Sequence, residues 1–190
     1  MKTSVAAAAC LLATLGTAHA QTVTYALDPT HTFVSFEVAH FGTSVNRGRW
    51  DKKEGSVKFD RAAKTGSVEI TIDMASVSTG VVPFDNHLKS KDFFNTAEHP
   101  TAKFVGDRFI FSGDKVTSVE GTLTLLGKSQ PVTLKANQFN CYSNPIFKRE
   151  VCGGDFEATI QPTLWGISNY IPAVAPDKVR LVVQVEAIKQ

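Results

Sequence analysis

The chain has 190 residues, of which 43% are hydrophobic and 20% are charged, and its formal net charge is +2. This length suits one domain that can bury a real core. The 20 basic and 18 acidic side chains are scattered along the chain, a pattern that speaks against nucleic acid or an anionic membrane surface as a partner.

The N-terminal residues have the pattern of a secretory signal peptide. Lys2 precedes an apolar run at residues 5–15, and the small residues Ala18 and Ala20 follow. A charged start, an apolar middle and an Ala-x-Ala end predict cleavage after Ala20. The alternative is a lipid attached to Cys10, but this cysteine lies inside the apolar run. We therefore expect a signal peptide at residues 1–20.

The remaining residues, 21–190, are expected to form a single domain in the periplasm. They contain no stretch that is long and apolar enough to cross a bilayer. Cys141 and Cys152 are an even pair in an oxidising compartment, which predicts a disulfide bond between them. Their spacing is a poor one for a metal ion, and no second His/Cys pair accompanies it. The sequence predicts neither a metal nor a cofactor.

The first two predicted strands are residues 22–27 and residues 28–41. In the second, Val34, Phe36, Val38 and His40 fall on one face, and the residues between them fall on the other. His40 continues an apolar face. It is either a core histidine bonded to the backbone or to water, one at the open end of the strand, or a contact to a ligand.

The rest of the chain repeats this strand pattern, with one interruption. A polar connection is expected from Gly42 to Gly48, and a short helix from Phe84 to Phe94, because its apolar residues follow a helical spacing. The further predicted strands are residues 50–60, 67–74, 101–111, 115–126, 130–139, 154–164 and 177–188.

Most of these strands have one apolar and one polar face, and no helices alternate with them. This pattern predicts an all-β, antiparallel sheet of about eight strands with one short helical insert. A sheet of this size without a partner layer tends to close into a barrel, which removes its edges. A two-sheet sandwich is the alternative.

Known catalytic patterns are missing from the sequence. It has no G-x-S-x-G, no phosphate-binding glycine loop and no H-E-x-x-H. Its main feature is a set of apolar side chains that fall on one face of each predicted strand. They either fill a core or line a lumen that takes an elongated apolar ligand. The candidates for such a lumen are Val34, Phe36, Val38, Phe59, Ile70, Ile72, Phe104, Leu123 and Leu125.

Several stretches together resemble the YceI-like family of secreted, lipocalin-like polyisoprenoid-binding proteins, and the resemblance covers nearly all of residues 21–190. The matching stretches are Tyr25-x-Leu27-Asp28-Pro29-x-His31-Thr32-x-Val34-x-Phe36-x-Val38-x-His40, the run from Asp85 to Phe94, His99-Pro100-x-Ala102-x-Phe104, Val119-x-Gly121-x-Leu123-Thr124-Leu125-x-Gly127, Trp165-Gly166-Ile167 and Asp177-x-Val179. The sequence departs from the family at Pro162, where relatives often have an arginine.

The resemblance implies a lipocalin-like barrel that binds the long tail of an isoprenoid lipid, either a quinone or a polyprenyl lipid. His40 and Trp165 complete the set of expected ligand contacts. It implies a carrier with no established catalysis. Two other functions stay open: an enzyme or redox partner acting on an isoprenoid quinone, with a membrane cytochrome as a possible partner, and a structural or stress-related module with a filled core. The sequence leaves the oligomeric state open.

Overall fold

The computed structural model describes residues 22–146 and 148–190. The expected signal peptide, its cleavage site and Cys10 therefore lie outside the described residues. The strands are β1 (Val23–Leu27), β2 (Phe33–His40), β3 (Ser44–Trp50), β4 (Lys53–Asp60), β5 (Thr65–Asp73), β6 (Val77–Ser78), β7 (Thr101–Ser112), β8 (Lys115–Leu125), β9 (Lys128–Asn144), β10 (Arg149–Ile160) and β11 (Val179–Lys189). The helical elements are α1 (Val82–Lys89) and two 3-10 turns, η1 (Met74–Ser76) and η2 (Pro162–Trp165).

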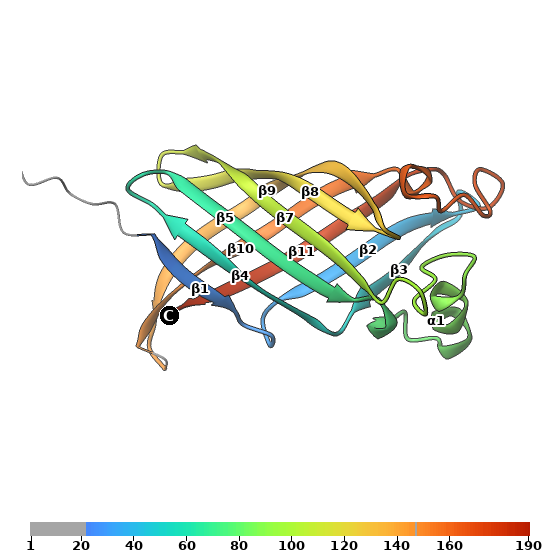
Figure 1. Ribbon diagram of the computed structural model, residues 1–190, viewed down its shortest axis with the longest axis horizontal. Coiled ribbons are helices and arrows are strands. Elements are labelled where there is room, and N and C mark those ends of the chain that lie inside the picture. Colours follow the sequence, from blue (N-terminus) through green and yellow to red (C-terminus); the bar gives the residue numbers. More distant parts are fainter. Residues whose placement is uncertain (1–21, 147) are drawn as a thin grey trace, which may run out of the picture.

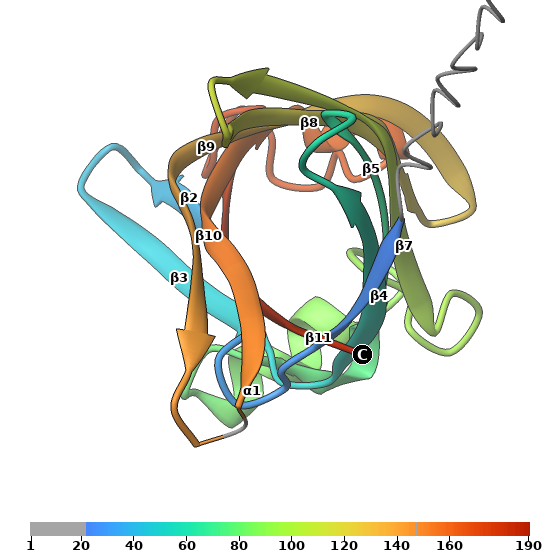
Figure 2. The same cartoon turned by 90° about the vertical axis from the view of Figure 1, so that its left-hand side faces the viewer.

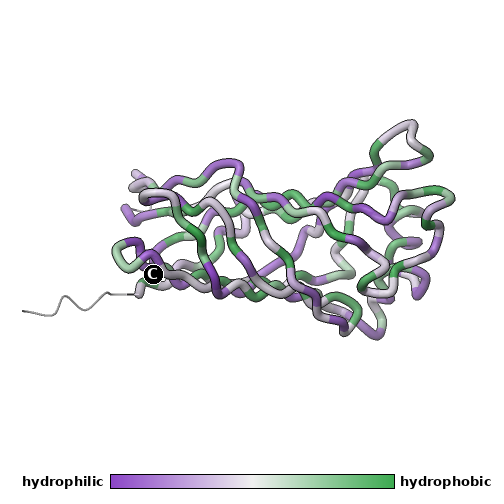
Figure 3. Tube along the Cα trace, turned by 90° about the horizontal axis from the view of Figure 1, so that it is seen from above, coloured by the Kyte–Doolittle hydropathy of each residue, from purple (hydrophilic) through white to green (hydrophobic). Residues whose placement is uncertain are grey.

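Eight of these strands close into an antiparallel barrel, which confirms the predicted fold class. Their order is β1-β4-β5-β7-β8-β9-β10-β11, and pairing of β1 with β11 closes the ring. Figure 1 shows the strands crossing the molecule obliquely, and Figure 2 shows the ring end-on. Hydrophobic and hydrophilic residues alternate along parts of the strands, as the green and purple segments of Figure 3 show. This period of two places one apolar face inside the barrel.

The two ends of the barrel differ in their connections. One end, the mouth end, holds α1 and the long connection at residues 161–178 (Figure 1, right). The other end, the far end, holds the short turns after β4, β7 and β9, together with the C-terminus. Among the described residues, the α-helix and the longest connection therefore both lie at the mouth end.

Near the mouth end the wall continues beyond the ring. Strand β11 pairs with β1 through residues 187–189 and with β2 through residues 179–184. Strand β3 pairs with β2 along its full length, but with β6 only at Arg49 and Trp50. Within the described residues, the stretch 44–48 therefore has no strand on its second side.

Several predicted boundaries are wrong. The strand expected at residues 28–41 begins only at Phe33, because residues 29–31 form a turn. The strands expected at residues 130–139 and 154–164 run over residues 128–144 and 149–160 instead. The connection expected at residues 42–48 is much shorter, because β3 begins at Ser44. The helix ends at Lys89 rather than at Phe94. Strand β10 ends at Ile160, and η2 replaces the strand expected up to Leu164. Proline lacks the N–H that a sheet ladder needs, so Pro162 begins a helical turn instead.

The predicted disulfide between Cys141 and Cys152 is present. The two cysteines are directly opposite each other on β9 and β10, with sulfurs 2.06 Å apart. The bond therefore joins neighbouring strands of the wall, near the far end, rather than spanning a loop.

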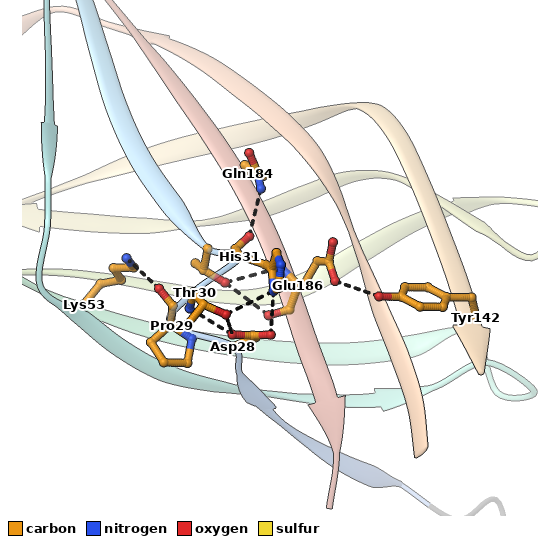
Figure 4. A network of polar contacts seen from close by, with 9 residues as sticks. Asp28, Pro29, Thr30, His31, Lys53, Tyr142, Gln184 and Glu186 are labelled. Carbon is orange, nitrogen blue, oxygen red and sulfur yellow. Dashed lines mark hydrogen bonds and ion pairs between the residues drawn. The ribbon is translucent and has the colours of Figure 1, made fainter. Parts of the chain in front are cut away.

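A polar network holds the turn between β1 and β2 (Figure 4). Asp28 is 5% exposed, and its Oδ1 accepts hydrogen bonds from the backbone N–H and the hydroxyl of Thr30 at 2.8 and 2.6 Å. Its Oδ2 lies 2.8 Å from Nδ1 of His31. Thr32, which is fully buried, donates to the carbonyl of Glu186 on β11. These contacts fix the point at which the chain changes from β1 to β2.

Replacing Asp28 with asparagine should lower stability and change its pH dependence. Burial of the Asp28 side chain raises its pKa, but hydrogen bonds from Thr30 and His31 outweigh that effect and lower the pKa from 3.8 to about 2. The carboxylate therefore stabilises the fold above pH ~4, and this contribution is lost as the pH falls towards ~2. We expect Asp28→Asn to cost roughly 2 kcal/mol near neutral pH.

Urea unfolding over a range of pH measures this effect. The control is Asp51→Asn, because Asp51 forms an exposed ion pair with Arg49 and should contribute little. An Asp28→Asn variant that keeps the acid dependence of the parent protein would show that the network has no part in it.

Candidate functional site

The barrel contains an internal cavity of about 470 Å³ in its mouth half. Its walls come from β2, β3, β5, β7, β8, β10 and β11, and it is covered by α1, by Phe93 and Phe94, and by the connection at residues 167–176. A volume of this size falls in the range of ligand sites and far exceeds the voids that packed cores leave.

The structure brings most of the predicted site residues to this cavity. Those that line it are Val34, Phe36, Val38, His40, Ile72, Leu123 and Leu125. A second, smaller cavity of about 60 Å³ lies nearer the far end. Three further candidates, Phe59, Ile70 and Phe104, line that smaller cavity. The predicted set is therefore divided between two spaces along the barrel.

Trp165 lines neither cavity. Its ring is 2% exposed, and its Nε1 donates a hydrogen bond to the carbonyl of Leu123 at 3.2 Å. The side chain of Leu123 lines the larger cavity, so Trp165 is bonded to the backbone of the cavity wall. Its predicted contact with a ligand stays a prediction.

Small residues in the wall keep the lumen open beside large aromatic rings. A Cβ atom added to Gly48 would lie 2.5 Å from Cζ of Phe36, its partner on β2. One added to Gly121 would lie 2.8 Å from Cζ of Phe104. Each ring therefore lies across a glycine of a neighbouring strand instead of filling the centre of the barrel.

Sequence reasoning missed the residues that cover the mouth. The ring of Tyr170 stacks on Phe93 with centroids 5.9 Å apart, and His87 packs edge-on against both. These contacts join α1 to the long connection across the opening. The only signal for them was the aromatic content of each segment, because contacts between residues so far apart in sequence leave no local pattern.

The start of this cover is fixed by Asp85. Its carboxylate accepts hydrogen bonds from the backbone N–H of Thr79 at 2.7 Å and from the Thr79 hydroxyl at 2.6 Å. These bonds hold the pKa of Asp85 below its ordinary value, although burial acts against them. Asp85 therefore anchors α1 to the segment after β6.

Polar groups in the cavity are few and are gathered towards the mouth end. None of the described lining residues is Asp, Glu, Lys or Arg. His40, at the end of β2, packs edge-on against Phe41 with centroids 4.8 Å apart and faces the cavity. The polar side chains of the lining are His40, Asn46, His87, Asn169 and Tyr170.

The segment with Pro162 is held without an arginine. Both hydrogen bonds to the carboxylate of Asp177 come from Thr163, one from its backbone N–H and one from its hydroxyl. Pro162 is buried and lines the cavity. Proline in place of the arginine that relatives often have therefore leaves this part of the wall closed and apolar.

Within residues 22–146 and 148–190, no three His, Cys, Asp or Glu side chains lie together as a metal site would require. The same part of the chain has no helix with the length and hydrophobicity needed to span a membrane.

A closed antiparallel barrel around an uncharged, apolar cavity is the architecture of a lipid-binding β-barrel. The model of the YceI-like domain matches residues 25–187. The UPF0312 protein of Pseudomonas savastanoi pv. phaseolicola is 35% identical over 139 residues, which are 72% of each chain. This chain therefore belongs to the YceI family.

Solved structures show the same fold. The structure of BcnA from Burkholderia cenocepacia has a TM-score of 0.72 and 25% identity, over 85% of this chain and 99% of BcnA. A polyisoprenoid binding domain from Saccharophagus degradans, implicated in plant cell wall breakdown, has a TM-score of 0.64 and 16% identity, over 88% and 99% of the two chains.

Proposed function

We propose that this protein is a periplasmic carrier that holds a long isoprenoid lipid inside its barrel. The observation that carries the proposal is the cavity of about 470 Å³, whose lining is apolar and without charged groups. Such a lining stabilises a hydrocarbon chain by removing it from water. The described polyisoprenoid binding domain of Saccharophagus degradans, which has the same fold, supports this choice of ligand.

The distribution of polar groups suggests the direction of the ligand. The polar lining residues lie at the mouth, so the head group would lie there and the tail would extend towards the smaller cavity. His40, His87 and Tyr170 can exchange hydrogen bonds with a neutral oxygen. The lining offers no lysine or arginine for a diphosphate, and a buried charge without a partner is costly. These features favour a neutral head group, such as that of a quinone.

Location in the periplasm is supported by the signal-peptide pattern of residues 1–20 and by the disulfide between Cys141 and Cys152. A quinone ligand would also be compatible with transfer to a membrane cytochrome, but no contact in the structure favours a particular redox partner. A module with a filled core is less consistent with a cavity of this size.

Organic extraction of the purified protein, followed by mass spectrometry, tests the proposal. We expect an isoprenoid lipid in an amount close to one molecule per chain when the protein is produced in a host that makes such lipids. Protein that is stripped of lipid and offered an isoprenoid quinone should take it up again. A preparation that never carries or takes up an isoprenoid, or that holds only phospholipid, would overturn the carrier function.

A further inference from the structure

Exposed apolar side chains gather at the mouth end. Phe41 in the turn after β2 is 64% exposed, Val81 and Val82 at the start of α1 are 55% and 68% exposed, and Tyr170 in the long connection is 50% exposed. We call these four residues the mouth rim. They come from three separate segments, all of which lie at the same end of the barrel in Figure 1.

The stretches immediately around the rim residues contain no charged residue. Residues 38–46, 74–84 and 161–176 include no Asp, Glu, Lys or Arg. The turns of the far end are different, because residues 60–64, 112–115 and 144–150 each contain charges of both signs. Helix α1 begins in the stretch 74–84 and carries charges further on, at Asp85 and Lys89. Exposed apolar side chains on uncharged stretches are therefore found together at the mouth end, whereas the exposed Ile146 of the far end lies in a turn with charged residues.

The rim is continuous with the cavity. Phe41 and Tyr170 are half or more exposed, yet both also line the cavity, which therefore reaches the surface between them. The backbone N–H of Phe41 donates to the carbonyl of Val174 at 2.8 Å, so the turn after β2 and the long connection are held together. An apolar chain that left the cavity would meet these side chains first.

We propose that the mouth rim docks on the surface of a lipid bilayer. Exposed aromatic and aliphatic side chains on stretches that carry no charge themselves are suited to the boundary between head groups and acyl chains. Docking there would let an isoprenoid pass between bilayer and cavity without its tail crossing water, which is costly for each methylene group. The transfer of an isoprenoid through the rim rests on the proposed carrier function, whereas docking of the rim on a bilayer does not.

The absence of charge also identifies the kind of bilayer contact. Attraction between charged groups would need anionic lipid and would weaken in salt. Insertion of apolar side chains needs neither condition. The rim should therefore bind neutral phosphatidylcholine vesicles, and binding should persist at an ionic strength of about 0.5 M, at which exposed charges are strongly screened.

Vesicle flotation with the chain 21–190 tests the proposal. The variant Val81→Ser/Val82→Ser removes two rim side chains that do not line the cavity, and serine is a favourable residue at the N-terminus of a helix. We expect it to lower vesicle binding several-fold, and Phe41→Ser to lower it roughly tenfold. The matched control is Ile146→Ser, because Ile146 is 82% exposed but lies in the turn after β9 at the far end.

Several results would overturn the docking proposal. The first is a protein that does not bind neutral vesicles, and the second is a protein that binds only anionic vesicles and is released by salt. The third is an equal loss of vesicle binding in the Val81→Ser/Val82→Ser variant and in the Ile146→Ser control. A rim that binds a protein but no vesicle would overturn it as well. Isoprenoid extraction from the same preparations separates the two proposals: normal lipid content with no vesicle binding would reject docking alone, and vesicle binding without any isoprenoid would reject the carrier function alone.

Discussion

Replacing Ile72 with tryptophan is expected to abolish isoprenoid binding while leaving the barrel folded. Ile72 lies on β5 opposite Ala102 on β7, and both side chains face the large cavity. A larger side chain forced into a filled core costs about 1–3 kcal/mol. The open cavity gives the indole room, so the cost in stability should stay below this range while the path of the ligand is blocked.

The complementary change, Ile72→Ala, separates a lined cavity from a filled core. In a filled core, such a substitution costs about 2–5 kcal/mol. In this cavity one side of Ile72 already lacks packing partners, so the empty protein should lose less, and part of the effect should be seen as weaker ligand binding.

Both variants are checked by urea unfolding and by the amount of lipid that purified protein carries. The control is Thr71→Trp, which places the same ring on the same strand but on the opposite face. It should leave lipid content unchanged. If Ile72→Trp unfolds the protein and wild-type preparations never contain lipid, the interior is filled and the cavity does not bind a ligand.

Removing the disulfide between Cys141 and Cys152 should cause a large loss of stability. Cys141 and Cys152 are 11 residues apart in sequence, and the chain-entropy model gives about 3 kcal/mol for closing a loop of this order. We therefore expect Cys141→Ser/Cys152→Ser to lower the free energy of unfolding by about that amount, because the unfolded chain gains freedom.

Urea unfolding of the chain 21–190, with and without reductant, measures this contribution. Reductant should destabilise the parent protein and leave the double variant unchanged, which makes the variant its own control. If the reduced and oxidised forms unfold at the same urea concentration, the bond contributes nothing to stability.

The sequence was sufficient to predict the barrel because apolar and polar residues alternate along its strands, as a sheet with one buried and one solvent-exposed face requires. On β5, Val68, Ile70 and Ile72 are buried, whereas Glu69 is exposed. The inward face of the strands, and hence most of the cavity wall, follows from this parity.

Strand β3 was missed because it has no buried face, so its sequence does not alternate between apolar and polar residues. Most of its residues are exposed or half-buried, and only Trp50 at its end is buried. The cover of the mouth was missed for another reason. Contacts such as Tyr170 with Phe93 join residues far apart in the chain, and neither segment alone shows where it will pack.

The free edge of β3 has a mechanical consequence. The far half of the wall is hydrogen-bonded all the way round through the pairing of β1 with β11, so its width is fixed by the strand ladder. The mouth half ends at residues 44–48, which have no strand on their second side in the described chain. Hydrogen bonds need not break for this edge to move outwards. The strand ladder therefore constrains the bore of the mouth half less than it constrains the bore of the far half.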